Sequence, residues 1–380
     1  MARIRTAVVG MNHGLEHVVE VLGNPRFRLV AVCARDQAKL AWLRGEPAVD
    51  HEPGWYHAHR AALLNRARAH PELAQVKLTT EFDGVLGMPD VDAVILTVPI
   101  HLNAPFAVRA LQAGKHCFAS KPFAVNVEQG VQLLRAVQNS PQAFIVGFQY
   151  RYAPLFVHAR KMIEAGFLGS VKQLWWNMAR RPLRVAHNRR ELSGGPYLAD
   201  CCHWLDLFEF FQPGARFTRV GAFGGLDVPN THVDFPDNGV TIIEYDTGVR
   251  GSLNFTYFTD QPEHNVWGLQ GTGGKIRGDT EDAGRFLMFS GPTQDRTEFA
   301  VNPAKAYHGL HGHLGFDRIH EAFADQIEIR DHARAADEAE RGLENLLVCL
   351  AADRAILEGR VVKREEFANS GRSQECDPRR

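Results

Sequence analysis

The sequence has almost no net charge and no long apolar run, and these two absences limit its partners. Its 43 basic and 44 acidic residues give a formal net charge of -1, so no global field attracts DNA or an anionic membrane. A membrane-spanning helix needs a run of about 18 apolar residues, which does not occur here. We therefore expect neither nucleic acid nor a membrane as a partner.

Cysteines are few and irregularly spaced, which excludes a disulfide framework and a CxxC metal or redox motif. The six are Cys33, Cys117, Cys201, Cys202, Cys349 and Cys376. Free thiols are typical of a reducing compartment. The first residues run directly into an apolar strand with no basic and apolar leader before it. We expect a cytoplasmic protein.

The 380 residues are enough for two domains, and the first part of the chain has the pattern of a parallel sheet. Short apolar runs alternate there with helix-like stretches, and the insertion at 44–76 is polar and compatible with a helix. The predicted buried strands are 6–9, 29–33, 93–98, 116–119 and 144–148. This alternation predicts a doubly wound α/β domain over 1–150, with ligands at the carboxyl ends of the strands.

Beyond residue 150 the pattern changes to longer alternating segments, which indicate antiparallel strands separated by turns. A helix is expected at 155–165, strands at 171–178, 240–245 and 250–257, and helices again over 316–357. We therefore predict a second α/β domain at 151–365, built on a large, mostly antiparallel open sheet. A polar tail would follow at 366–380.

The turn after the first predicted strand contains the residues of a phosphate-binding loop. A dinucleotide needs a tight glycine turn there, so that its pyrophosphate can approach the helix N-terminus. Gly10 fits the first glycine, while Asn12 stands at the second and Gly14 falls one position early, after His13. Asparagine tolerates left-handed backbone geometry, so the pattern favours a cofactor site, with an ordinary strand-to-helix turn as the alternative.

The end of the second predicted strand bears on the choice between NAD and NADP. An NAD enzyme places an acid there for the ribose 2′-hydroxyl, but this chain has Ala34 followed by Arg35. Without a carboxylate to repel a 2′-phosphate, NADP is slightly favoured over NAD. Two alternatives stay open: Arg35 is a solvated loop residue, or Asp36 takes the role of the acid.

Six further segments form a pattern through their order and spacing: 92–105, 113–122, 146–152, 193–196, 202–207 and 311–317. Together they resemble the Gfo/Idh/MocA family of sugar dehydrogenases, and the resemblance covers about residues 1–365. The family usually has Glu-Lys-Pro at the end of the second segment, whereas this chain has Ser120-Lys121-Pro122. The resemblance implies an N-terminal Rossmann NAD(P)-binding domain followed by a C-terminal α/β substrate domain.

The resemblance also implies catalytic roles for Lys121 and His203. Hydride transfer at a hydroxyl or keto carbon needs a proton partner, and histidine suits that role at neutral pH. An ammonium at Lys121 would hydrogen-bond the reacting oxygen. The family commonly has an aspartate four residues before the histidine, where this chain has Ala199, so Asp200 is the candidate helper. Asp206 is expected to be structural.

Further residues are expected to contact the ligands. The expected cofactor-binding set is Gly10, Asn12, His13, Gly14, Ala34, Arg35, Thr97, Pro99, His101, Lys121 and Pro122. The expected substrate-binding set is Lys121, Gln149, Arg151, His203 and His311. Arginines 180, 181, 184, 189 and 190 would bind an acidic sugar or form a solvated face. His308, His311 and His313 lack a carboxylate or cysteine at zinc-like spacing, so no metal is expected.

These features predict an NAD(P)-dependent dehydrogenase or reductase acting on a hydroxyl or keto carbon of a sugar, cyclitol or related polyol. The alternatives are a non-catalytic NAD(P) and sugar sensor on the same scaffold and a reductase of a non-sugar substrate. The apolar alternating strands at 171–178 and 240–257 would pair subunits, giving a homodimer or homotetramer.

Overall fold

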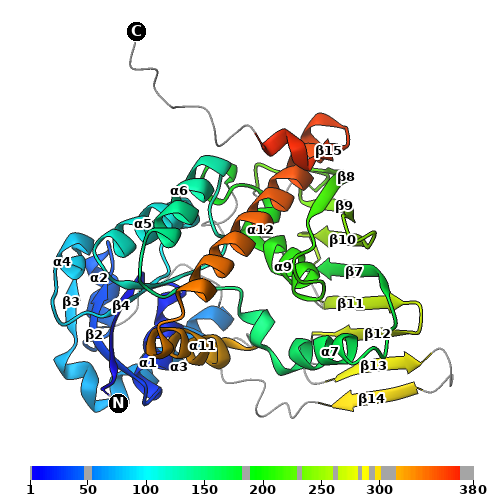
Figure 1. Cartoon of the computed structure of the whole chain (residues 1–380). Helices are drawn as coiled ribbons and strands as arrows, with labels where there is room; N and C mark the ends of the chain where they lie inside the picture. Colours follow the sequence, from blue (N-terminus) through cyan, green and yellow to red (C-terminus); the bar gives the residue numbers. More distant parts are fainter. Residues whose placement is uncertain are drawn as a thin grey trace, which may run out of the picture. The chain divides into compact units, whose positions relative to one another are not determined.

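The computed structural model describes residues 2–46, 54–181, 189–228, 233–259, 264–280, 285–290, 296–300 and 314–368 (Figure 1). The chain divides into two compact units. Unit 1 comprises Met1–Phe123, Gln132–Gly147 and Tyr307–Arg341, and unit 2 comprises Ala124–Val131, Phe148–Ala306 and Gly342–Arg380. Among the described residues, no helix is both long and apolar enough to cross a membrane.

Unit 1 contains a six-stranded parallel sheet, as the apolar runs predicted. Its order is β3-β2-β1-β4-β5-β6, so the chain reverses its direction of travel across the sheet between β1 and β4. The strands are β1 Ile4–Val9, β2 Phe27–Cys33, β3 Lys77–Thr79, β4 Ala93–Leu96, β5 His116–Ala119 and β6 Phe144–Val146. The sequence pattern missed β3, because this three-residue edge strand is half-exposed and has no apolar run.

Helices connect the strands of this sheet. They are α1 Gly14–Gly23, α2 Gln37–Trp42, α3 Gly54–Ala69, α4 Phe82–Leu86, α5 Asn103–Gln112 and α6 Val127–Gln138. The insertion at 44–76 contains α3, as its composition indicated.

The helix α11, Phe316–Ile329, belongs to unit 1 although it comes late in the sequence. Its His320 is fully buried and its ring stacks on Phe118 of β5 at a centroid distance of 5.3 Å. His17 of α1 contacts the same phenylalanine, and its Nδ1 lies 3.0 Å from Nε2 of His320. These contacts place α1 and α11 together on one face of the sheet.

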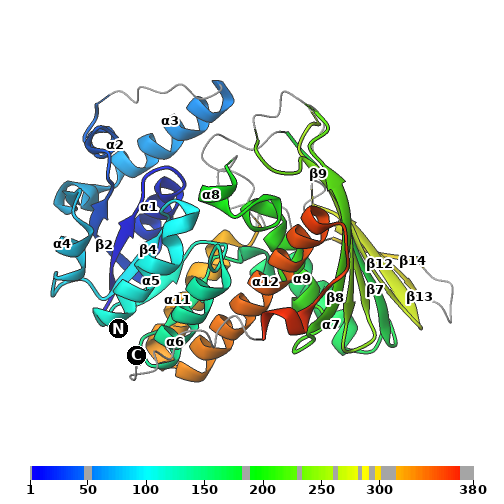
Figure 2. The ribbon, with the colours of Figure 1, turned by 90° about the horizontal axis from the view of Figure 1, so that it is seen from above.

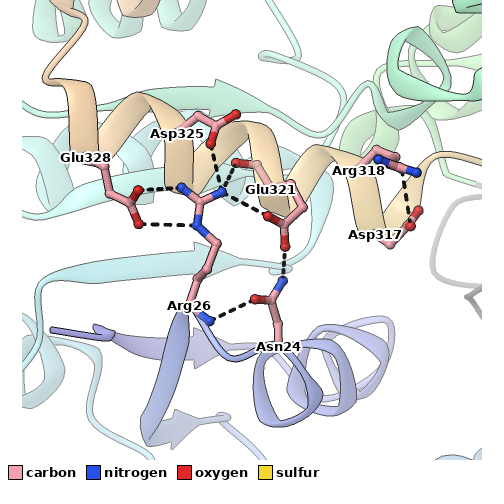
Figure 3. Close-up of polar contacts among 7 residues, drawn as sticks. All are labelled: Asn24, Arg26, Asp317, Arg318, Glu321, Asp325 and Glu328. Atoms are coloured by element: carbon pink, nitrogen blue, oxygen red, sulfur yellow. Dashed lines mark hydrogen bonds and ion pairs between the residues drawn. The ribbon is translucent and has the colours of Figure 1, made fainter. Parts of the chain in front are cut away.

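A polar cluster fastens the outer surface of α11 to the loop before β2 (Figure 3). The Arg26 guanidinium pairs with carboxylates of Glu321, Asp325 and Glu328 at 2.7–2.9 Å. Asn24 donates a hydrogen bond to Glu321 at 2.6 Å. The ion pairs raise the pKa of the guanidinium above its usual value.

Unit 2 is built on a nine-stranded sheet that is mostly antiparallel, as predicted. Its order is β14-β13-β12-β11-β7-β10-β9-β8-β15. The strands are β7 Val171–Ala179, β8 Phe217–Gly225, β9 Asn238–Tyr245, β10 Arg250–Thr256, β11 His264–Gly271, β12 Gly274–Asp279, β13 Arg285–Ser290, β14 Arg296–Ala300 and β15 Val362–Lys363. The pair of β7 and β10 is parallel, which differs from the antiparallel reading of these two segments.

Helices cover one face of this sheet, as seen in Figure 2 for α9 and α12. They include α7 Pro154–Glu164, α8 Arg190–Ser193, α9 Cys202–Phe210 and the part of α12, His332–Glu358, that lies in unit 2. Trp176 of β7 is at the centre of this core, where it stacks on Trp204 of α9 at 4.1 Å. The opposite face carries the exposed side chains of Phe223, Val240 and Ile242.

Candidate active site

The glycine turn of unit 1 lies where the strand order reverses. Gly10 follows β1 with a φ of +110°, and a Cβ atom there would lie 2.4 Å from the carbonyl oxygen of Thr97. A Cβ at Gly14 would lie 2.5 Å from Oγ1 of the same threonine, which follows β4. Only glycine allows these segments to approach so closely, and a pyrophosphate needs the same clearance. The turn therefore fits a dinucleotide.

Asn12 and His13 are exposed at the tip of this turn. The Asn12 side-chain oxygen accepts a hydrogen bond from the Lys39 ammonium at 2.5 Å. His13 precedes the first residue of α1, and its Nδ1 lies 3.6 Å from the buried Glu16 carboxylate. Lys39 thus brings a positive charge to the tip of the turn.

Three residues at the end of β2 were considered as contacts of the ribose, and their surroundings differ. Ala34 is buried, and its N–H donates to the Thr79 carbonyl at 3.1 Å. Asp36 accepts a hydrogen bond from the Ala38 N–H at 3.0 Å and so caps the N-terminus of α2. Arg35 is exposed. Asp36 is exposed as well, so both charged side chains lie at the surface and the carboxylate also caps α2.

The segment after β4 runs along the carboxyl edge of the sheet. Thr97 binds the Val9 carbonyl through both its N–H, at 2.8 Å, and its hydroxyl, at 3.0 Å. Pro99 then precedes the short 3₁₀ helix Ile100–Leu102, which contains His101. Thr97, Gly10 and Gly14 therefore form one compact cradle.

Lys121 follows β5 at the same edge of the sheet, and its side chain is half-exposed. The peptide bond between Lys121 and Pro122 is cis. The Ser120 N–H donates to the Leu96 carbonyl at 3.0 Å, and the Ser120 carbonyl accepts from the buried Asn103 amide at 3.0 Å. The backbone before Lys121 is thus hydrogen-bonded on both sides.

His203 lies in the first turn of α9, directly after a π-helical turn at Tyr197–Cys201. Such turns are rare and occur frequently at functional sites. The imidazole is 7% exposed, and its ring contacts Tyr150 edge to face at a centroid distance of 4.9 Å. Phe148 contacts it in the same way at 6.1 Å. Two aromatic rings therefore restrict the orientation of the imidazole.

Asp200, the candidate helper of His203, lies inside the π-helical turn and is 7% exposed. Its carboxylate pairs with the Arg180 guanidinium at 2.6 Å. An α-helical spacing of three residues would put Asp200 and His203 on one face, but a π-helical turn rotates less per residue. The ion pair with Arg180 was not predicted from the sequence.

Arg151, a predicted substrate-binding residue, is only 6% exposed. Its Nε donates to Oδ2 of Asp206 at 2.6 Å, and its Nη2 pairs with the other oxygen of that carboxylate. Nη2 also lies 3.3 Å from Glu209. This guanidinium anchors α9 to the 3₁₀ helix Gln149–Tyr152, whose first residue, Gln149, is also buried. Asp206 has the structural role expected of it, though with a partner outside its own helix.

The remaining candidates from the sequence are arginines of the basic run and three histidines. Arg190 pairs with the buried Asp353, and burial raises the pKa of that carboxyl. Arg184, His308, His311 and His313 lie outside the described residues. Within the described ranges, no group of three or more His, Cys, Asp or Glu side chains could hold a metal ion.

The structure gathers the predicted residues in each unit. In unit 1 the cradle, Arg35 and Lys121 follow the carboxyl ends of strands, and in unit 2 His203, Asp200 and Arg151 lie on or beside α9. Sequence reasoning missed three supporting residues, Lys39, Asn103 and Tyr150, and it did not predict the pairing of Arg180 with Asp200. Asn103 and Tyr150 lie in segments that carried the family resemblance, but no local signal linked Lys39, Asn103 or Arg180 to its partner.

Comparison with known proteins covers both units. Residues 4–148 match the family model described as oxidoreductase family, NAD-binding Rossmann fold, and residues 156–277 match the GFO/IDH/MocA C-terminal domain. A dTDP-3,4-didehydro-2,6-dideoxy-alpha-D-glucose 3-reductase from Streptomyces violaceoruber is 30% identical over 277 residues, covering 70% of this chain and 78% of the relative. A levoglucosan dehydrogenase from Pseudarthrobacter phenanthrenivorans is 28% identical over 227 residues, covering 50% of this chain and 57% of the relative.

A solved structure has the same fold across nearly the whole chain. GenD2 from gentamicin A biosynthesis, crystallised in complex with NAD, superposes with a TM-score of 0.74 at 21% identity, covering 96% of this chain and 97% of that one. Both family domains occur in order along the chain, and the Streptomyces relative matches 70% of its residues. The chain therefore belongs to the Gfo/Idh/MocA family of oxidoreductases.

Proposed function

We propose that this protein is an NAD(P)-dependent dehydrogenase or reductase acting on a hydroxyl or keto carbon of a sugar, cyclitol or related polyol. The observation that carries the proposal is the cradle of Gly10, Gly14 and Thr97 at the reversal of strand order, where a Cβ atom on either glycine would collide with the threonine. The sugar substrates in the names of the two curated relatives support the substrate class.

The cofactor we favour is NADP. Arg35 is exposed at the end of β2, Asp36 is engaged in capping α2, and Lys39 reaches the tip of the glycine turn. A 2′-phosphate would find the positive charges of Arg35 and Lys39 there, against the one carboxylate of Asp36. Asn12, His13, Ala34, Pro99, His101 and Pro122 complete the proposed cofactor contacts.

The proposed chemistry divides between the cofactor and two side chains of the protein. Bound nicotinamide supplies or accepts the hydride. His203 gives a proton to the substrate oxygen, or takes one from it, and its aromatic neighbours keep the imidazole oriented. The role proposed for Lys121, from the family resemblance, is to donate a hydrogen bond to the reacting oxygen and to stabilise the charge that develops on it.

We also propose supporting roles for residues on or beside α9. We propose that the helper of His203 is the ion pair of Asp200 and Arg180 rather than the Asp200 carboxylate alone. Gln149 and His311 remain proposed substrate contacts. We assign Arg151 to support of α9 instead of direct binding, because its guanidinium already pairs with Asp206 and Glu209.

The open face of the nine-stranded sheet supports assembly into a homodimer or homotetramer. Phe223, Val240 and Ile242 are 81%, 54% and 56% exposed on neighbouring strands, and cross-strand pairing puts Val240 beside Phe223. Apolar side chains grouped in this way favour a protein partner. Ile242→Glu should lower the mass measured by light scattering, while Ile329→Glu on α11 should not. A wild-type monomer would exclude this assembly.

Two further features belong to this proposal. The described cysteines Cys33, Cys117, Cys201, Cys202 and Cys349 are free and buried, which supports a cytoplasmic location. We assign dinucleotide binding to residues 1–150 and substrate binding and assembly to 151–365, followed by a polar tail at 366–380. The helix α11 is an exception, since it belongs to unit 1.

Turnover on a panel of sugars and cyclitols, followed by nicotinamide absorbance, tests the activity. We expect turnover with at least one polyol or its ketone, and a loss of more than about 100-fold in kcat for His203→Ala. Cofactor binding without turnover on any member would favour a sensor on the same scaffold. Turnover that survives His203→Ala would refute the role of this histidine.

A further inference from the structure

Asn103 is a buried amide that binds the backbone on both sides of Lys121. It is the first residue of α5 and is 1% exposed. Its Nδ2 lies 3.0 Å from the carbonyl oxygen of Ser120, 3.3 Å from that of Lys121 and 3.5 Å from that of Pro122. An amide nitrogen has two N–H donors, so it can satisfy the two nearer carbonyls at once.

These carbonyls need such a donor because the β-ladder has ended. The last residue of β5 is Ala119, whose carbonyl accepts from the Gly147 N–H at 2.7 Å. Beyond Ala119, the Asn103 amide donates to the carbonyls of Ser120 and Lys121. A buried carbonyl without a donor would be costly, so the amide stabilises this particular backbone path.

Gly147 confines the same backbone from another direction. A Cβ atom there would lie 3.2 Å from the Lys121 nitrogen and 3.2 Å from the Ser120 Cα, closer than an ordinary contact. The main chain at Lys121 is therefore held by the Asn103 amide and packed against the backbone after β6.

We propose that Asn103 is a positioning residue for Lys121, acting through the main-chain carbonyls rather than by touching a ligand. The inference rests on the proposed function, in which Lys121 meets the reacting oxygen. Only the donor side of the amide is used: Oδ1 of Asn103 is buried and has no hydrogen-bond partner among the described residues. The role therefore needs an N–H donor and not merely a polar side chain of this size.

The test compares Asn103→Ala with a matched asparagine of the same unit. Asn24 is 8% exposed and binds Glu321 and the Arg26 N–H, away from the carboxyl edge of the sheet. Asn103→Ala should lower kcat by about 10- to 100-fold with little change in KM, because small displacements of a reacting group have effects of that size. Asn24→Ala should leave kcat within about twofold at a similar loss of stability.

A second readout does not depend on activity. The rate of reductive methylation of Lys121 in the cofactor-free protein, followed by mass spectrometry, should change in Asn103→Ala and not in Asn24→Ala. Asn103→Ser, which keeps one donor, should give intermediate values, and it serves as the test variant if the alanine variant does not fold.

The outcomes distinguish a failure of the positioning role of Asn103 from a failure of the catalytic role of Lys121. Unchanged kcat and methylation in Asn103→Ala, with turnover lost in Lys121→Ala, would overturn the positioning role and leave the proposed function intact. An equal loss of kcat in Asn24→Ala would also overturn it, since general destabilisation would explain both variants. Wild-type turnover in Lys121→Ala would refute the catalytic role of Lys121, and methylation alone would then decide the role of Asn103.

Discussion

The ion pair between Arg151 and Asp206 makes a quantitative prediction about how α9 is held. The two side chains are 6% and 1% exposed, and the guanidinium makes two contacts with the carboxylate and one with Glu209. Removing one partner leaves a buried charge uncompensated, which costs about 3–5 kcal/mol. Arg151→Met keeps the apolar stem, so its loss of stability should come mainly from the stranded Asp206.

The assay is urea unfolding followed by tryptophan fluorescence. Trp204 on α9 stacks on Trp176 of β7, so these two of the six tryptophans contribute to the signal when α9 leaves the sheet. Arg151→Met should lose about 3–5 kcal/mol, and Asp206→Asn should lose less because Glu209 still pairs with the guanidinium. Arg151→Met combined with Asp206→Leu should lose less than Arg151→Met alone. A loss below about 1 kcal/mol in Arg151→Met, together with a large rise in KM, would refute this reasoning and return Arg151 to the substrate site.

Three further predictions concern unit 1. His320 is fully buried and desolvation lowers its pKa from 6.5 to about 4, so the unfolded chain takes up a proton first as pH falls. The free energy of unfolding should therefore decrease by about 3 kcal/mol between pH 7 and pH 4. Unfolding curves of His320→Phe should lack this decrease. The same pH dependence in the wild type and the variant would contradict the role of His320. Gly14→Ala should weaken NADPH binding at least about tenfold in fluorescence titration, because its Cβ would meet Thr97, while Gly23→Ala in the same helix, where a Cβ meets nothing, should bind normally. Arg26→Ala should cost about 1 kcal/mol in denaturation at low salt and less at high salt, since the guanidinium and its three carboxylates are partly exposed; no salt effect would argue against an electrostatic role.

The sequence predicted the strands that consist of a continuous apolar run or of regular apolar and polar alternation. The buried runs of β1, β4 and β5 identified the parallel sheet, and the alternation in β7, β9 and β10 identified the second sheet. What it missed depends on partners far apart in the chain. The parallel pairing of β7 with β10 and the place of α11 on the first sheet follow from tertiary contacts that no local period records.

The candidate site was predictable to a similar degree. Gly10 and Gly14 predicted the turn from the sequence. The reason that both positions need glycine is the close approach of Thr97, which only the structure shows. The spacing of Asp200 and His203 assumed an α-helix, and the π-helical turn changes that geometry. Arg151 was expected to bind substrate because a guanidinium can pair with an anion. In the structure it pairs with the buried carboxylate of Asp206 instead.

The measurement that tests the central claim most directly is titration of the purified protein with NADPH and NADH separately, followed by nicotinamide fluorescence. We predict saturable binding of both, tighter for NADPH, with that preference lost in Arg35→Ala. Binding of neither dinucleotide would contradict the assignment of the Gly10 turn as a cofactor site, and with it the proposed oxidoreductase activity.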